Sequence, residues 1–494
     1  MEKRTRSHII RLLLFVAFLL FVSVAAFMKG ALILLVIGLG GGIILLSYRL
    51  DIGLYIMVFL TPLIGWQFHA DYFRSFLGDN SSLLEFYVPM VDFWTIILMI
   101  AYAVYLLRKW LKGEKHKITL PGIGLFTLFL LSAVLSLFNV SGSEFGTSIS
   151  YIIRFPLFIY VGYIILGTNI IRDKIILDRA LSVYAWVGCA GALMGLVSLF
   201  VGSYGVGGLH RAVPLSIFGW APLSYVNIAY GPILLAEMLT TAFPVMLYLA
   251  YRAKQESERM LYLSMSALTA VITLLTFSRS GWLTLMFEIS LCAYFMRTSI
   301  PWDKVKKFLP IAGVVVVPLA IYMLLFLRTT VVSSSNSTRL ALTQIGWELF
   351  LEHPVLGQGV GTFLDRLSEV RFFLYEFGEP IDAHSILTKI STEQGVVGII
   401  TFALFIGWVC TSIYTRMKDN DYSPRARMVA LLSFFLVAAP IFFQLFNTQY
   451  YSARMWIPIV FAMSMNLVYR DESKNALVYT HFRPDKYKIE RKIK

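Results

Sequence analysis

Charged residues are scarce in this chain of 494 residues. Asp, Glu, Lys and Arg together make up 15% of it, whereas an average soluble domain contains about 25%. Hydrophobic residues reach 58%, and the apolar runs are long and uninterrupted rather than alternating. This composition excludes a soluble enzyme, a disordered protein, a coiled coil and a β-barrel. The chain is therefore expected to be an all-α, polytopic membrane helical bundle.

Cysteine is equally scarce. The three cysteines, Cys189, Cys292 and Cys410, each lie inside an apolar run, which is typical of small core residues. We expect no disulfide, because no pairing pattern is visible. No His or Cys cluster has the spacing of metal ligands, so we expect neither a metal site nor another cofactor.

Apolar runs of about 20 residues predict membrane spans. Because 50–65 and 280–296 are short, we expect 12–14 transmembrane helices. The N-terminal run imitates a signal peptide, but it is too long and lacks a small-x-small cleavage site, so we expect it to be retained. The candidate spans are 9–28, 31–48, 50–65, 86–107, 121–138, 150–167, 180–201, 228–251, 260–277, 280–296, 307–327, 395–415, 428–446 and 451–469.

These spans divide the chain into four parts. Residues 1–327 hold the first eleven transmembrane helices, and 328–394 form one large loop. Residues 395–469 hold the last three helices, and 470–494 form a basic tail.

The formal charge of +14 could indicate nucleic-acid binding, but in a membrane protein excess Lys and Arg usually marks cytoplasmic loops. With the N-terminus in the cytoplasm, 32 of the 43 Lys and Arg fall on the cytoplasmic side, split evenly between the two types. We therefore expect both termini in the cytoplasm and the large loop on the outer face.

The positive charges left on the outer face are mostly arginine, whose planar fork suits phosphate and carboxylate oxygens. We infer that this face binds an anion, and we favour a phosphorylated one. The alternative is that these residues pair with Asp and Glu on the same face. The outer set is Lys29, Arg74, Arg154, Arg211, Arg279, Arg328, Arg339, Arg366, Arg371, Lys389 and Arg454.

The large loop contains two periodic apolar stretches, LALTQIGWELFLEH and GTFLDRLSEVRFFLYEF, which predict amphipathic helices. Between them HPVLGQGVGTF predicts a flexible turn. It is not a dinucleotide fingerprint, since no strand precedes it and the glycine spacing is wrong. A second outer loop, 202–227, is glycine-rich and carries His210 and Arg211.

Two residues near the outer face stand out chemically. Arg279 lies in TFSRSGWL, a tight turn between two apolar runs, and an Arg close to the membrane core is usually functional or paired. His384 opens a helical stretch, DAHSILTKISTEQGVVG, closely after Asp382. A histidine that titrates near neutrality is a natural general base, although a lone loop histidine is more often incidental.

Four charged residues fall within predicted spans: Asp92, Arg154, Glu237 and Glu288. Arg154 and Glu237 are candidates to pair and fix the bundle, or to line a path for a polar lipid head group. Glu393 is a candidate either for a structural role at a helix end or for a contact with Lys389 or an arginine.

Three segments together resemble the O-antigen ligase and polymerase superfamily. They are TFSRSGWL, STRLALTQIGWELFLEHPVLGQGVGTF and DAHSILTKISTEQGVVG, and they cover residues 276–398. The shared features are a Ser-Arg pair at a span boundary, an Arg followed by Trp and then His-Pro-x-x-Gly-x-Gly-x-Gly, and a His heading a helix that ends in Glu-x-Gly-x-x-Gly.

The resemblance implies a GT-C-like, inverting, metal-independent membrane glycosyltransferase. It would take a glycan from undecaprenyl diphosphate on the outer face of the bacterial plasma (inner) membrane. Arg279 and Arg339 would bind the diphosphate, with Arg211 and Arg328 as second candidates, and His384 would take the proton of the acceptor hydroxyl. Many relatives place Asn after this histidine, where this chain has Ser385.

Charge chemistry supports the same assignment, because a diphosphate leaving group needs positive charge where its negative charge grows. The chain has one D-x-D sequence, Asp419-Asn420-Asp421, but the charge count places it in a cytoplasmic loop. We therefore interpret it as a solvated turn and expect arginines to replace a metal ion.

Alternative functions remain open at this point. The acceptor would be lipid A–core for a ligase, or another carrier-linked glycan for a polymerase. Aromatic residues within 66–76 fit either sugar stacking or an interfacial belt. A transporter or flippase is a further alternative, although no internal repeat is visible, as is a structural or regulatory membrane partner. Membrane lipids are expected partners and nucleic acid is not.

Overall fold

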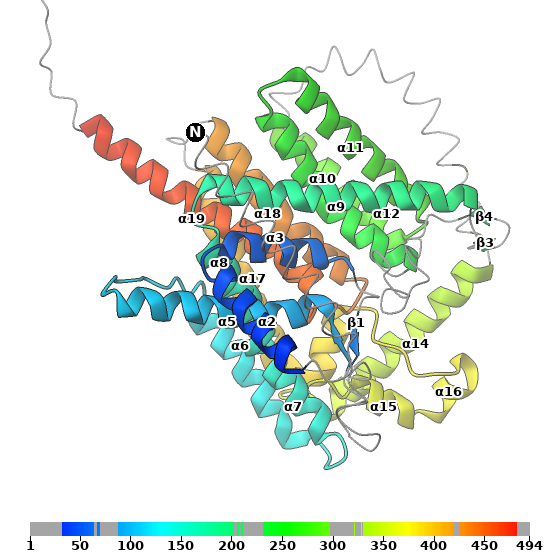
Figure 1. The fold of residues 1–494 in the computed structure, drawn as a ribbon. Coiled ribbons are helices and arrows are strands. Elements are labelled where there is room, and N and C mark those ends of the chain that lie inside the picture. The colour runs from blue at the N-terminus through cyan, green and yellow to red at the C-terminus, as the bar shows by residue number, and fades with distance from the viewer. Residues whose placement is uncertain are drawn as a thin grey trace, which may run out of the picture.

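The computed structural model describes residues 32–63, 67–69, 87–201, 205–206, 209–210, 231–296, 321, 328, 330–418 and 424–481. These residues form a helical bundle with two small antiparallel hairpins, β1 (Gln67–His69) with β2 (Tyr87–Pro89), and β3 (Gly205–Val206) with β4 (Leu209–His210). Figure 1 shows the bundle and, at its lower right, a group of shorter helices. The all-α class is confirmed.

The helices follow the predicted apolar runs closely. In the first half of the chain they are α2 (Leu32–Leu46), α3 (Leu50–Leu60), α5 (Met90–Leu111), α6 (Ile123–Leu135), the 3-10 turn η3 (Ser136–Asn139), α7 (Phe145–Arg154), the π-helix η4 (Phe155–Ile165), α8 (Leu166–Ile170) and α9 (Lys174–Val201). In the second half they are α10 (Gly231–Arg252), α11 (Glu256–Leu275), α12 (Arg279–Met296), α14 (Thr330–Glu352), α15 (Phe363–Glu369), α16 (Arg371–Phe377), α17 (Ile386–Lys418), α18 (Pro424–Gln444) and α19 (Ala453–His481).

Six helical segments in the described part are long and apolar enough to cross a membrane. They are Met90–Leu111, Phe145–Ile170, Lys174–Phe200, Gly231–Arg252, Glu256–Leu275 and Ile386–Tyr414. Three shorter apolar helices match further predicted spans: Ile123–Asn139, Met428–Gln444 and Ala453–Tyr469. The predicted spans 9–28 and 307–327 lie outside the described residues apart from Ile321, so the total of 12–14 stays a prediction.

The first described helices depart from the prediction. We expected two separate spans at 31–48 and 50–65, but α2 and α3 are joined by a bend of 106° and count together as at most one broken span or a re-entrant pair. The two helices are short, with 15 residues in α2 and 11 residues in α3. At 1.5 Å per residue neither helix reaches the roughly 30 Å of the hydrocarbon core.

The turns between helices gather at two ends of the bundle. At one end, which we call the motif end, α14, α15 and α16 meet the turn after η3, where Asn139 Nδ2 donates to the Gly357 carbonyl at 2.7 Å. At the other end, Thr119 N donates to Asn169 Oδ1 at 2.8 Å, and Arg252 pairs with Asp178. This grouping matches the predicted outer and inner loops. Which end faces the cytoplasm stays a prediction.

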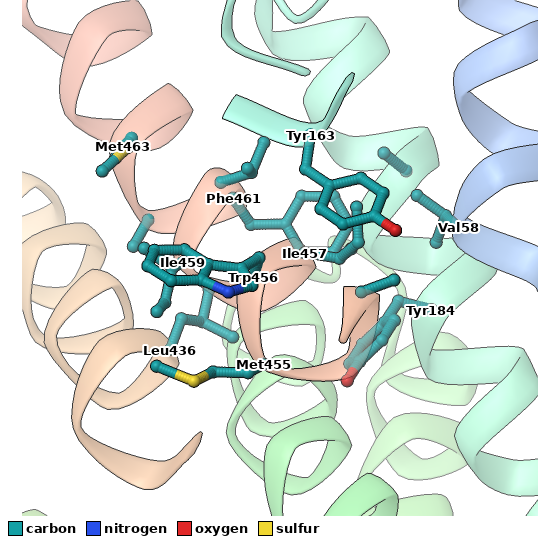
Figure 2. Close-up of a cluster of buried hydrophobic side chains, with 14 of the residues drawn as sticks. Val58, Tyr163, Tyr184, Leu436, Met455, Trp456, Ile457, Ile459, Phe461 and Met463 are labelled. Atoms are coloured by element: carbon teal, nitrogen blue, oxygen red, sulfur yellow. The ribbon is translucent and has the colours of Figure 1, made fainter. Parts of the chain in front are cut away.

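The main hydrophobic core surrounds α19. Trp456 and Phe461 of α19 are each 1% exposed, and Figure 2 shows them among Tyr163 of η4, Tyr184 of α9 and Leu436 of α18. A helix that is apolar on all sides is stable only when other helices surround it. The central position of α19 therefore fixes the turn just before it, at 445–452, within the motif end.

A second, smaller core holds α14, α15 and α16 together. The expectation of amphipathic helices in the large loop is confirmed, because each of these helices turns an apolar face into this core. Its buried members are Leu342, Ile345, Phe363, Leu367, Phe373 and Ala383. Ala383 lies next to His384, so the same core that folds the loop also anchors the segment leading into α17.

Candidate active site

Arg279 is positioned by the turn that joins α11 to α12. Ser278 caps α12, since its Oγ accepts a hydrogen bond from Gly281 N at 3.3 Å. Phe277 adopts a left-handed conformation with φ of 53° and is only 2% exposed. Its ring packs edge-on against Trp282, with centroids 5.9 Å apart. The buried Phe277 thus holds the tight turn that places Arg279 at the first position of α12.

The beginning of α14 lies against this turn. The Arg279 guanidinium donates from Nη2 to Ser335 Oγ at 3.2 Å and from Nη1 to Asn336 Oδ1. Arg339 follows one helical turn later on α14 and is half-buried. Burial lowers the pKa of Arg339, and the positive charge of Arg279 lowers it further. The two guanidinium groups are therefore close enough to repel each other.

Neither of these arginines has a carboxylate partner among the described residues. Two adjacent, half-buried positive charges are unfavourable unless an anion neutralises them. Guanidinium groups bind the oxygens of phosphate or carboxylate in a bidentate manner. Arg279 and Arg339, which we call the unpaired arginines, therefore form a candidate anion site.

His384 lies near Arg339, one of the unpaired arginines. Burial lowers its pKa, the charge of Arg339 lowers the pKa further, and the carboxylate of Asp382 partly opposes both effects. The imidazole is therefore neutral at pH 7 and able to accept a proton. His384 also has a φ of 51°, a left-handed conformation that is uncommon for a residue other than glycine. Such backbone strain often marks a functional position.

A network of hydrogen bonds fixes the segment around His384. Lys389 Nζ, which is 1% exposed, donates to Asp382 Oδ1 at 2.7 Å and lies 3.6 Å from Glu393 Oε1. Tyr451 OH donates to Asp382 Oδ2 at 3.3 Å. Of the two roles considered for Glu393, contact with Lys389 is present. Asp382 thus joins the start of α17 to the turn before α19.

The glycine-rich turn after α14 supports the same segment. Gln358 N and Gly359 N donate to the carbonyls of Thr392 and Glu393, at 2.8 and 3.0 Å. Gly357 is left-handed, and a Cβ on it would lie 2.3 Å from the Glu393 backbone. The turn is therefore present as expected, but it is buried and hydrogen-bonded, so the prediction that it is flexible is wrong.

A kink in α17 completes this contact. Gly395 has φ of 64° and ψ of −162°, which interrupts the helix. The interruption leaves Val396 N and Val397 N free to donate to the carbonyls of Pro354 and Val355, at 2.9 and 3.3 Å. The Gly-x-Gly-x-Gly and Glu-x-Gly segments are therefore two halves of one structural unit. The kink coincides with the predicted boundary between the large loop and the next span.

The structure brings three of the five predicted site residues together: Arg279, Arg339 and His384. Arg328 is exposed, and in the described part of the chain no hydrogen bond or ion pair joins it to them. Arg211 lies outside the described residues, as do Asp419–Asp421 and the side chains at 66–69 and 70–76. Within the described ranges no group of three or more His, Cys, Asp or Glu residues is arranged to hold a metal ion.

The buried charges pair differently from the prediction. Arg154 does not pair with Glu237. Instead Arg154 Nη2 lies 2.6 Å from Asp92 Oδ2, and Arg454 pairs with Glu237. Paired with Asp92, Arg154 lies at the wall of a cavity.

Glu288 has no such partner. Both of its oxygens are buried and lack a hydrogen bond in the described structure. Its place on α12, nine residues after Arg279, puts it away from the turn that carries the site.

Sequence analysis missed Tyr151 and Tyr451, whose rings lie edge-to-face with centroids 5.5 Å apart. Lys389 Nζ lies 5.9 Å from the Tyr151 ring centroid and 5.6 Å from that of Tyr451. The available signal was Lys389 itself, a lysine near the start of a predicted helix that leads into a membrane span, because a buried lysine requires partners.

Comparison with known proteins bears on these segments directly. Residues 264–403 match the family model described as O-antigen ligase. The matched segment is similar to the O-antigen ligase family, in agreement with the resemblance of the three motif segments. No curated protein sequence matches the chain.

The match to the O-antigen ligase family begins within α11 and ends within α17, so it contains Arg279, Arg339 and His384. Members of this family are membrane enzymes of the glycosyltransferase type, and the long apolar helices of this chain agree with a multi-pass membrane protein. The match supports a function of the O-antigen ligase or polymerase type in general.

Proposed function

We propose that this protein transfers a glycan from undecaprenyl diphosphate to an acceptor hydroxyl, as an inverting, metal-independent enzyme of the O-antigen ligase type. The observation that carries the proposal is the pair of unpaired arginines, Arg279 and Arg339, beside the neutral His384. Both an anion site and a proton acceptor are needed for this reaction, and they occur side by side.

The donor would bind through its diphosphate. Arg279 and Arg339 neutralise the phosphate oxygens, and they do so most strongly as the bond between the anomeric carbon and the diphosphate oxygen breaks. Undecaprenyl diphosphate leaves with the bonding electrons. Arg211 and Arg328 are second candidates for contacts with the same diphosphate.

His384 would activate the acceptor. Its neutral imidazole takes the proton of the acceptor hydroxyl while that oxygen attacks the anomeric carbon from the side opposite the leaving group, which inverts the configuration. The lowered pKa of His384 favours the neutral, proton-accepting form before the reaction. Asp382, held by Lys389, stabilises the imidazolium that forms.

The proposal includes an orientation and a division of the chain. We place the motif end on the outer face of the bacterial inner membrane, with both termini in the cytoplasm, because the positive-inside count favours it. Residues 1–327 and 395–469 then form the membrane part, 328–394 the outer loop with the reactive residues, and 470–494 a cytoplasmic tail.

The test uses purified protein in lipid with a defined undecaprenyl-diphosphate glycan. One reaction contains lipid A–core as acceptor, and another contains only more donor. Single-step capping of lipid A–core is the result expected for a ligase. Growth of chains on the donor alone would assign the polymerase activity of the same superfamily instead. Absence of glycan transfer in both reactions would contradict the proposal, and movement of donor across the bilayer would then favour a flippase.

A further inference from the structure

A cavity of about 520 Å³ opens at the motif end, beside the candidate active site. Its walls come from the end of α3, the junction of β2 with α5, the junction of α7 with η4, and the turn between α18 and α19. This volume lies within the range of about 300–1,000 Å³ typical of small-molecule sites. The cavity is built from four separate parts of the bundle, none of which belongs to the matched family segment.

The cavity is connected to His384 through Asp382. Tyr151 and Tyr451 line it, and Tyr451 OH donates to Asp382 at 3.3 Å. The charged end of Lys389 lies near both tyrosine rings and binds the same carboxylate. Asp382 is two residues before His384, so the tyrosine wall and the proton acceptor share one anchoring group.

His384 lies between two different environments. One contains Arg339 of α14, which lies close to Arg279 of α12 and whose charge lowers the pKa of His384. The other contains Asp382 with the tyrosine wall, contributed by α7 and the turn between α18 and α19. An inverting displacement requires the entering and leaving oxygens on opposite sides of the anomeric carbon. The arginine side suits the leaving diphosphate, and the tyrosine side suits the entering hydroxyl.

The chemistry of the cavity favours an uncharged ligand. Two arginines line it, but Arg154 is neutralised by Asp92 and Arg454 by Glu237. A second diphosphate would therefore find no unpaired positive charge among the described lining residues. Most of the lining is apolar, and the rings of Tyr151 and Tyr451 together with polar side chains such as Gln449 add aromatic faces and hydrogen-bonding groups that a sugar can use.

We propose that this cavity is the acceptor site, where Tyr151 and Tyr451 bind the sugar that carries the attacking hydroxyl. The proposal rests on the function proposed above and adds a place for the second substrate. The donor diphosphate and the acceptor sugar would then occupy opposite sides of His384. The acceptor would be selected by the walls of the bundle rather than by α14–α16.

The test measures transfer kinetics with each substrate varied in turn, using lipid A–core and, separately, excess donor as the acceptor. Ser452→Trp fills the cavity from the turn before α19, and Ser150→Trp fills it from the exposed rim on α7. Ser143→Trp is the matched control, because Ser143 is exposed at the same end but does not line the cavity. Thermal unfolding establishes that each variant is folded, and Ser150→Trp serves if Ser452→Trp does not fold.

Both cavity variants should raise the KM for the acceptor about tenfold or more and leave the KM for the donor at the wild-type value. The control should match the wild type. An increase in the donor KM alone would assign the cavity to the donor and overturn the inference, and so would unchanged kinetics in both variants. If the wild-type protein transfers no glycan, the proposed function itself fails, whereas an active wild type with unaffected variants refutes only the acceptor site.

Discussion

The arginines at the motif end form two groups with the same side chain and different surroundings. Arg154 and Arg454 each pair with a carboxylate that is at most 1% exposed. Arg279 and Arg339 have no carboxylate partner in the described part of the chain, and they lie close enough to repel each other. The fold therefore neutralises one group itself, whereas the other is the group that we propose an anionic ligand neutralises.

This difference separates structural charges from functional ones. A buried ion pair loses stability when either partner is removed, because the remaining charge is left without compensation. An unpaired charge repels its neighbours in the free protein, so its removal costs little stability but weakens anion binding. Variants of the two groups should therefore fail in different measurements.

His384, beside the unpaired arginines, gives the largest expected effect. His384→Ala should lower the transfer rate about 10²- to 10⁴-fold, which is the contribution typical of a general base. The residue is half-buried in a loop, so the variant should remain folded and inserted. Transfer rate and thermal unfolding of the same preparation check both statements. Full activity in the variant would refute the general-base role.

Arg454 tests the paired group. Arg454→Met leaves the buried Glu237 without its counter-charge and should lower the free energy of unfolding by about 3–5 kcal/mol. Glu237→Gln combined with Arg454→Met should restore much of this stability. Denaturant unfolding in detergent measures both variants. If the single variant were as stable as wild type, the pairing would have no structural role.

Arg279 tests the unpaired group. Both Arg279→Ala and Arg279→Lys should reduce transfer about 10²- to 10³-fold, because lysine cannot bind phosphate oxygens through a planar fork. Stability should change little in either. Arg371→Lys is the matched control, since Arg371 is exposed on α16 and has no carboxylate partner in the described structure. Wild-type transfer by Arg279→Lys would leave Arg279 only a point-charge role.

The positions of the spans and of the site motifs could be predicted, because both depend on local sequence. Apolar runs gave the helices, and the three motif segments gave Arg279, Arg339 and His384. The direction in which a helix runs is not determined by local sequence. The apolar region at 31–65 was expected to form two spans, but its helices are joined by a bend of 106°. Run length reports that a segment prefers the membrane, but not how its two halves are oriented.

The partners of the buried charges could not be predicted. Arg154 lies 62 residues from Asp92 in the sequence, and Arg454 lies 217 residues from Glu237. Sequence analysis proposed Arg154 with Glu237, which is chemically equivalent and spatially wrong. Any buried carboxylate satisfies an arginine, so only the packing of α5, α7, α10 and α19 decides which pairs form.

Two charges act on the pKa of His384, that of Arg339 and that of Asp382, and their removal should shift the pH dependence of transfer in opposite directions. Activity requires the neutral imidazole, so it is lost as pH falls through the pKa of His384, which lies below the ordinary value of about 6.5. Asp382→Asn removes the charge that raises this pKa and should move the acidic limb of the pH–rate profile to lower pH. Arg339→Gln removes the charge that lowers this pKa, so the acidic limb of the pH–rate profile for its residual transfer activity should move to higher pH. Shifts in the same direction in both variants would contradict this arrangement of charges.

Removal of divalent ions gives the smallest expected effect. Because the unpaired arginines already supply positive charge for the leaving diphosphate, EDTA should leave the turnover of wild-type protein unchanged. The sharper comparison is Arg279→Ala assayed with and without added Mg²⁺. If guanidinium groups alone stabilise the diphosphate, the ion should not rescue this variant, because no acidic cluster in the described structure would hold it at the site. Loss of wild-type turnover in EDTA, or strong rescue of the variant by Mg²⁺, would assign part of the leaving-group stabilisation to a metal ion. The unpaired arginines would then differ less in function from the paired Arg154 and Arg454.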